Sequence, residues 1–240
     1  MTLLRSRAVA NCPVGNVSWR DAQDFINRLH EMTGMKYRLP WEAEWEYAAR
    51  SGGKSEKYAG GNDVDNVAWY DSIEIHPVGT KAAEGFGLYD MSGNVWQWVQ
   101  DWYDEKYYGK SPQKNPGGPS SGQYRVLRGG SWYDSAPSVR AAFRGWSNPD
   151  NRGTDYGFRL AGTAGFCDSL SALRKNANCF RKPVVSASVL LFQIVKIDKG
   201  HRGTCNLRHA PIPLINCLNT GFDFPKLDEL GCNILLLKSQ

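Results

Sequence analysis

The stretch Gly87–Trp102, GLYDMSGNVWQWVQDW, holds three of the chain's nine tryptophans within sixteen residues. Gly93 and Asn94 suit a tight turn, because glycine and asparagine adopt a positive φ at the least cost. Side chains alternate in the extended run that follows, so Trp96 and Trp98 share one side of it. A buried indole offers a large apolar area and one N–H donor. The stretch therefore predicts a strand whose indoles form core beside loops.

Composition limits the class of protein. The chain has 240 residues, of which 41% are hydrophobic, and this is enough to form a core. Its formal net charge is +5, but the lysines and arginines are scattered without a basic run. The longest apolar run, 184–195, is far shorter than the roughly 20 residues that span a bilayer. We therefore expect neither a nucleic-acid partner nor a membrane span.

The composition changes abruptly near residue 163. Every tryptophan and tyrosine lies at or before Tyr156, whereas five of the six cysteines lie after the change. The change predicts a lead at 1–12, a domain at 13–163 and a cysteine-containing extension at 164–240. The cysteines of the extension are Cys167, Cys179, Cys205, Cys217 and Cys232. Their irregular spacing favours free thiols over a zinc site, a redox motif or disulfides.

The extension leaves two interpretations open. In the extension, the apolar runs 189–197 and 234–237 predict strands or a short helix. The extension is then either an appended partner segment or a read-through product without a selected fold.

In the N-terminal lead, Arg5 and Arg7 interrupt the apolar core that an export signal needs, so we expect no signal peptide.

Two helices are predicted. Residues 18–33 place apolar side chains at helical spacing, with Ser18 as N-cap, Asp21 three positions on and Gly34 as the stop. Residues 40–50 begin with proline and carry acidic groups in the first turns. The short β runs are 125–127 and 157–160. We therefore expect an α+β domain whose many loops are held by side chains.

Four arginines are expected to fasten these loops. A guanidinium presents a rigid fork of donors that matches carboxylates and carbonyl oxygens. The arginines are Arg128, Arg140, Arg144 and Arg159, and the acidic groups of the second helix are Glu42, Glu44 and Glu46. We predict that all of them belong to the scaffold.

Six motifs occur in one order: PVGNVSWRDAQDFINRL, YRLPWEAEWEYAAR, GLYDMSGNVWQW, RVLRGGSW, RAAFR and GFRLA. In their order and spacing, residues 13–162 resemble the formylglycine-generating enzyme, or sulfatase-modifying factor, family. The resemblance implies a C-type-lectin-like α+β domain with little regular secondary structure. The family's first strands normally lie upstream of PVGNVSW, so we expect an N-terminally truncated domain.

Calcium is a cofactor that the resemblance implies. Family members bind it with backbone carbonyls and a glutamate in the stretch matching GNVWQW, and hard cations take several oxygen ligands. Here Gln97 stands in place of that glutamate, so one formal charge is lost while an amide oxygen is kept. The candidate calcium ligands are Asn66, Val67, Gly93, Val95 and Gln97.

The cysteines that carry the family's chemistry are missing. Family members form formylglycine with two cysteines just after the GGS of RGGS, which hold copper, and Cu(I) requires soft thiolates. In this chain the segment Gly129–Ser138 reads GGSWYDSAPS, and there is no cysteine between Cys12 and Cys167. No nucleophile elbow, Walker loop or histidine metal cluster replaces them. We therefore expect neither copper nor oxidase activity.

The same region has the composition of a recognition surface, rich in the Tyr, Ser, Gly, Asn and Trp that paratopes favour. The candidate ligand-binding residues are Tyr133, Asp134, Ser135, Trp146, Ser147, Asn148, Gly153, Thr154, Asp155 and Tyr156. The block RGGSW…NPDNR…GFRLA also resembles the variable region of proteins diversified by retroelements. Adenine mutation turns Asn codons into those for Tyr, Asp, Ser, Gly and Thr. Ordinary surface loops share this composition, so both interpretations remain.

The sequence thus favours a binding module over an enzyme. In this interpretation, a non-catalytic family member binds a protein or small ligand at the surface of residues 131–156. The alternative is a formylglycine-generating oxidase that acts on a sulfatase cysteine, and the missing thiolate pair counts against it.

Overall fold

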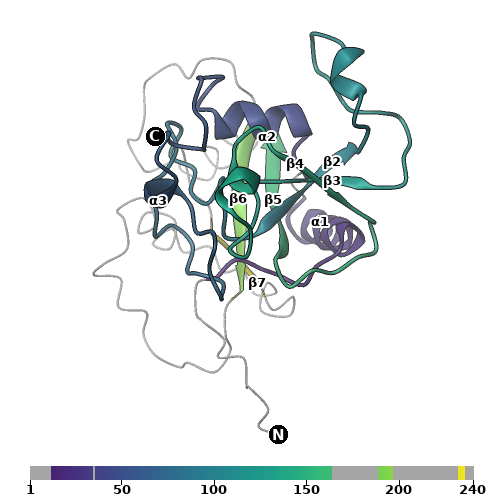
Figure 1. The fold of residues 1–240 in the computed structure, drawn as a ribbon. Helices are drawn as coiled ribbons and strands as arrows, with labels where there is room; N and C mark the ends of the chain where they lie inside the picture. Colours follow the sequence, from purple (N-terminus) through teal and green to yellow (C-terminus); the bar gives the residue numbers. More distant parts are fainter. Residues whose placement is uncertain (1–11, 35, 164–188, 197–231, 236–240) are drawn as a thin grey trace, which may run out of the picture.

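The described part of the chain is built on one mixed sheet (Figure 1). The structure, a computed structural model, describes residues 12–34, 36–163, 189–196 and 232–235, and beyond 162 only the backbone. The strands are β1 (Tyr37–Arg38), β2 (Trp96–Trp102), β3 (Arg125–Arg128), β4 (Arg144–Ser147), β5 (Tyr156–Thr163), β6 (Val189–Lys196) and β7 (Cys232–Leu235). Their order is β4-β3-β2-β5-β6-β7, and β1 also pairs with β5. Both predicted β runs in the domain are confirmed, as β3 and β5.

Helix α1 (Trp19–Thr33) begins and ends where the sequence predicts. The Ser18 hydroxyl accepts from the Asp21 N–H at 3.1 Å, and the Asp21 carboxylate accepts from the Ser18 N–H at 2.8 Å. This reciprocal pair satisfies two N–H groups that a helix start otherwise leaves unbonded. Gly34 ends the helix with a φ of 68°, the left-handed conformation that glycine adopts without strain.

Helix α2 (Glu42–Ala49) begins two residues later than the predicted start at Pro40. The Pro40 carbonyl accepts from the Gln100 N–H of β2 at 2.9 Å, so this residue continues the extended chain that leaves β1. The Trp41 N–H donates to the Glu44 carboxylate at 2.9 Å, which caps the first turn.

The remaining helical turns are α3 (Val64–Val67), η1 (Tyr107–Gly109) and η2 (Ala136–Val139). No helix in the described ranges is long and apolar enough to cross a bilayer.

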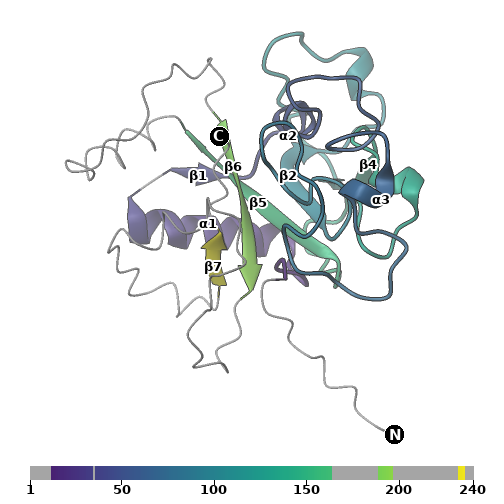
Figure 2. The same ribbon diagram turned by 90° about the vertical axis from the view of Figure 1, so that its left-hand side faces the viewer.

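The sheet separates two cores, because neighbouring residues of a strand face opposite sides. The α1-side core comprises Val14, Ala22, Ile26, Leu29, Leu39, Trp96, Trp98, Leu127, Phe158 and Leu160. The α2-side core comprises Trp45, Ala48, Ala49, Ala59, Leu88, Met91, Val99, Val126, Ala141 and Ala161. Figure 2 shows α1 on one side of β5 and α2 with α3 on the other. The indoles of Trp96 and Trp98 are core on the α1 side, as predicted.

A buried ion network joins α2 to β3 and β4. Arg144 donates to both carboxylate oxygens of Glu42, at 2.7 and 2.9 Å. Arg128 donates to the Glu46 carboxylate and to the Phe143 carbonyl. Glu42 is 2% exposed and Arg128 is fully buried. Two carboxylates thus face two guanidinium groups, and the loop-fastening role predicted for Arg128 and Arg144 is confirmed.

Asp101 adds a third carboxylate to this network. Its Oδ2 accepts from the Glu42 N–H at 2.7 Å, and the residue is 3% exposed. Burial raises the pKa of Asp101 to about 7; the Glu42 N–H opposes this rise, and the Glu42 charge adds to it. Arg128 and Arg144 pair with Glu42 and Glu46, and Asp101 forms no ion pair within the described residues. The charge of Arg144 lowers the pKa of Asp101, but by less than burial raises it.

We expect Glu42→Gln to lower the free energy of unfolding by about 3–5 kcal/mol, because it leaves buried guanidinium charge without its counter-charge. Glu44→Gln is the matched control on the same helix. Glu44 pairs with Arg38 at 2.6 Å where both side chains are about one-third exposed, so we expect a loss of under about 1 kcal/mol. Urea unfolding of both variants checks this, and equal losses would contradict the role given to Glu42.

The second prediction concerns pH. The pKa of Asp101 is about 7 in the folded chain and 3.8 ordinarily, so its stabilising contribution is complete below pH 4 and is lost as the pH rises through 7. Asp101→Asn keeps an acceptor for the Glu42 N–H and removes the titration. We expect the variant to lose less stability than the parent between pH 4 and pH 8. Urea unfolding at both pH values measures this, and an unchanged slope would count against it.

Candidate functional site

The loop that follows β3 is anchored to two other loops. The Trp132 N–H donates to the Asn94 carbonyl at 2.9 Å, and the Trp132 carbonyl accepts from the Ser72 N–H at 2.7 Å. Gly93 and Asn94 have φ values of 76° and 65°, which confirms the predicted turn. A Cβ at Gly93 would lie 2.1 Å from the Trp69 carbonyl oxygen, so this contact requires glycine. These contacts therefore fix the position of the loop backbone at Trp132.

Within this loop, only part of the predicted ligand-binding set is free. The Asp134 carboxylate accepts from the Ser131 N–H at 3.0 Å and from the Ser131 hydroxyl at 2.6 Å, so it braces the loop. Tyr133 is 74% exposed and lies edge-on to Trp132, with ring centroids 5.6 Å apart. Ser135 is also exposed. Tyr133 and Ser135 are thus the side chains that this loop offers to a ligand.

Trp146 lies on the edge strand β4 and forms an aromatic patch with Tyr103 and Tyr124. Its ring centroid is 4.5 Å from that of Tyr124 and 5.8 Å from that of Tyr103. Trp146 is 50% exposed and Tyr124 is 37% exposed. The register that sets Trp146 opposite Val126, and the Tyr103 N–H bond to the Tyr124 carbonyl, bring the rings together. The sequence analysis missed Tyr103 and Tyr124, because no local pattern marks a strand register.

The segment after β4 returns along α1. Asn148 and Thr154 are exposed there. The carbonyls of Gly153 and Asp155 accept backbone hydrogen bonds at 2.9 and 2.8 Å, so these two residues hold the chain in place. Asn148 and Thr154 remain as candidate contacts at this end of the segment.

Two of the predicted ligand-binding residues pack against the scaffold. Ser147 is 6% exposed, and its hydroxyl accepts from the Asn151 amide at 3.1 Å. Tyr156 lies edge-on to Trp98, with ring centroids 5.5 Å apart, against the α1-side core. Side-chain alternation along β4 turns Ser147 away from the face that carries Trp146. The structure therefore corrects the expectation of a surface contact at Ser147. Tyr156 is partly buried, and its contact with a ligand stays a prediction.

The predicted residues therefore lie in three places. Trp146 pairs with Val126 near the start of β3, whereas the 131–135 loop follows the other end of that strand, after Arg128. The 148–155 segment lies near α1, where Arg20 donates to Asp150 at 2.5 Å. Of these places, the aromatic patch around Trp146 is the one where three aromatic rings meet.

Gln97, a candidate calcium ligand, lies in a buried hydrogen-bond network. Its Oε1 accepts from Trp45 Nε1 at 2.8 Å and from the Arg159 guanidinium, and its Nε2 donates to the Asp90 carbonyl at 2.7 Å. Burial lowers the pKa of Arg159 to about 10, so this side chain stays charged at neutral pH. An oxygen that already faces a cation does not fit a Ca²⁺ ligand.

The other candidate calcium ligands also have structural roles. The Asn66 carbonyl accepts from the Ala82 N–H at 2.9 Å, and the Asn66 amide donates to Asp63 at 2.7 Å. Val67 and Val95 are each 3% exposed. Calcium binding through backbone oxygens of Asn66, Val67, Gly93 and Val95 stays a prediction.

Cys12 is a free, buried cysteine, 5% exposed. Burial, with the charges of Glu74 and Asp90, raises the pKa of Cys12 to about 11, so the thiol keeps its proton at neutral pH. Cu(I) binds thiolates, and a protonated buried thiol is a poor ligand for it. Within the described residues, no three His, Cys, Asp or Glu side chains are grouped so that they could hold a metal ion. The predicted tail thiols lie outside the described side chains.

A family model, the sulfatase-modifying factor enzyme 1-like domain, matches residues 2–164. The chain belongs to this family. It is 37% identical over 174 residues to the formylglycine-generating enzyme of Streptomyces coelicolor, and 39% identical over 155 residues to the serine/threonine-protein kinase pkn1 of Chlamydia caviae. The matches cover 64% and 63% of this chain but only 54% and 24% of those relatives. The chain thus spans about half of one relative and a quarter of the other.

Two solved structures share the fold of this chain. Treponema denticola variable protein 1 is 34% identical, with a TM-score of 0.59 over 62% of this chain and 70% of that protein. PvdO from Pseudomonas aeruginosa is 28% identical, with a TM-score of 0.56 over 65% of this chain and 64% of PvdO. The domain has the formylglycine-generating-enzyme-like, C-type-lectin-like fold that the sequence predicts, with a mixed sheet and few helices.

We expect Trp146→Ala to cost about 1 kcal/mol of stability or less, because half of this side chain is already exposed. Trp98→Ala, the matched control in the α1-side core, should cost about 3–5 kcal/mol because it leaves a cavity. Thermal and urea unfolding of both variants measure the difference. A loss at Trp146 as large as that at Trp98 would mean that the aromatic patch is scaffold.

Proposed function

We propose that this domain is a non-catalytic member of its family that binds a protein or small ligand. One observation carries the proposal: the loop after Gly130 lacks the two thiolates that the family's oxidase chemistry needs. In their place it has the exposed Tyr133 and Ser135, and Asp134, whose carboxylate is bonded to Ser131. Asp134 cannot replace a thiolate, because its carboxylate is a hard oxygen ligand and is already bonded to Ser131.

The aromatic patch supports a binding role. Exposed Trp and Tyr side chains supply large contact area at a small cost in conformational entropy, and they dominate binding energy at interfaces. Trp146 on the edge strand β4 packs against Tyr124, which directly precedes β3, with the two rings tilted at 46°, so each ring restricts the other before a ligand binds. Preorganised rings lose little freedom on binding.

Diversification by a retroelement is the finer form of this proposal. The similarity to Treponema denticola variable protein 1 supports it, and so do the Tyr, Ser, Asn and Trp residues at exposed positions of residues 131–156. A near-identical, adenine-rich template copy beside a reverse transcriptase gene in the neighbouring DNA is the expected finding. An absence of both from the complete locus would leave an ordinary binding domain.

The alternative function is a formylglycine-generating oxidase, which the name of the Streptomyces coelicolor relative favours. The test incubates the full chain with a sulfatase-motif peptide, copper and oxygen, and follows the peptide's cysteine by mass spectrometry. We expect no aldehyde, because no thiolate pair follows Gly130. The Streptomyces coelicolor enzyme serves as the positive control, and aldehyde formation by this chain would overturn the proposal.

A further inference from the structure

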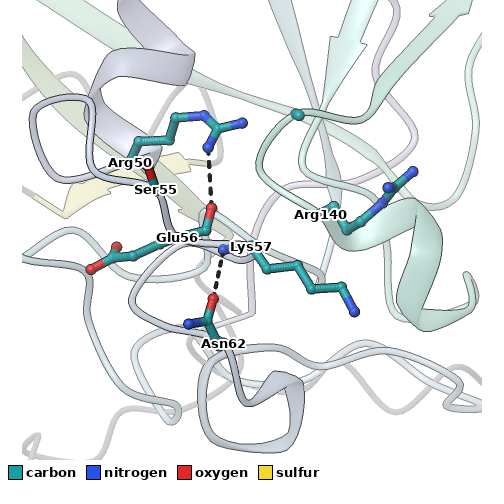
Figure 3. Close-up of a pocket in the computed structure, with 7 residues that line it drawn as sticks. Arg50, Ser55, Glu56, Lys57, Asn62 and Arg140 are labelled. Carbon is teal, nitrogen blue, oxygen red and sulfur yellow. Dashed lines mark hydrogen bonds between the residues drawn. The ribbon is translucent and has the colours of Figure 1, made fainter.

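A hollow of about 310 Å³ lies beside the end of α2 (Figure 3), and its lining includes no residue of the aromatic patch. The 50–62 loop forms one wall, and the 140–142 segment, which follows η2, forms the other. The Lys57 carbonyl accepts from the Ala141 N–H at 3.0 Å, so the two walls are joined by a backbone bond. Three basic side chains, Arg50, Lys57 and Arg140, line the hollow.

Arg50 is held in place before any ligand arrives. Its Nε donates to the Glu46 carboxylate at 2.9 Å, and its Nη1 donates to the Glu56 carbonyl at 3.2 Å. Within the described residues, no acceptor bonds to its Nη2. A guanidinium that is fixed on one side presents the other side to a ligand at little entropic cost.

Arg140 and Lys57 carry charge that no described carboxylate neutralises. Arg140 donates through Nε to the Pro137 carbonyl at 2.8 Å, and no described acceptor bonds to its two terminal nitrogens. The Lys57 ammonium lies 5.2 Å from the ring centroid of Tyr58, and it makes no ion pair within the described residues. Both side chains are exposed.

The hydrogen-bond acceptors that line the hollow either bond to donors of the protein or point away from the Lys57 ammonium. The Asn62 Oδ1 accepts from the Lys57 N–H at 2.9 Å, which leaves the amide nitrogen as a donor. Glu56 is the carboxylate of the lining, and Figure 3 shows it pointing away from the Lys57 ammonium. Its Oε2 accepts from the Ser51 hydroxyl at 3.3 Å. The lining therefore offers an excess of donors and of positive charge.

We propose that this hollow binds a tetrahedral oxoanion, of the class presented by a phosphate monoester. Such a group carries about two negative charges and three acceptor oxygens, which match donors that approach from separate directions. A carboxylate offers two coplanar oxygens and one charge, and so it satisfies fewer of these donors. The hollow does not involve Trp146, Tyr124 or Tyr103, so the proposal stands independently of the proposed function.

The test is calorimetric titration of the full chain at low ionic strength with O-phosphoserine, inorganic phosphate, sulfate and acetate. We expect one site for the phosphate ligands. Lys57→Ala combined with Arg140→Ala should weaken it by about tenfold or more, because two charge-assisted contacts are lost. Arg28→Ala combined with Lys114→Ala is the matched control, because it removes the same two charges from exposed positions outside the hollow. The control should keep the parent affinity.

Each outcome decides the proposal. The proposal is supported if phosphate binds more tightly than acetate and this binding is lost only in the Lys57 and Arg140 variant. If sulfate binds as tightly as phosphate, the hollow is a site for any tetrahedral dianion. Equal weakening in both double variants would show a general effect of net charge and overturn it. Acetate binding as tightly as phosphate, or no binding heat at all, would also overturn it. Unchanged melting temperatures confirm that the variants are folded.

Discussion

The ion network of Glu42, Glu46, Arg128 and Arg144 is the constraint on which the arrangement of this domain depends. Helix α2 has only eight residues, and it docks onto β3 and β4 through the buried Glu42 and the partly buried Glu46. Buried charges are costly unless each meets its counter-charge in good geometry. The helix, the two strands and the chain between them therefore have one arrangement that balances all four groups.

This network also positions the surfaces that a ligand can reach. Arg144 is the first residue of β4, so its pairing with Glu42 holds the strand that carries Trp146. Glu46 binds Arg128 on one side and Arg50 on the other, so the same carboxylate links the core to the hollow at the end of α2. Side chains that look unrelated along the chain are thus held by one set of contacts.

The loops reach a defined shape without much regular secondary structure. Backbone bonds join the 131–135 loop to the 69–72 and 93–94 segments, and left-handed glycines permit the close approach between them. These backbone bonds hold the loop while Tyr133 and Ser135 remain exposed. Tyr133 is 74% exposed and contacts Trp132 edge-on, so it buries little area against the loop.

The sequence by itself determined the family, helix α1 with both of its ends, the turn at Gly93 and the missing thiolate pair, because each of these is written in local spacing or in a residue type. Only the tertiary structure decided that Ser147 is buried, that Tyr156 packs against Trp98, that Gln97 faces Arg159, and that Trp146 meets Tyr103 and Tyr124. These outcomes depend on strand register and on contacts between residues far apart in the chain. A local sequence pattern does not predict strand register or contacts between distant residues.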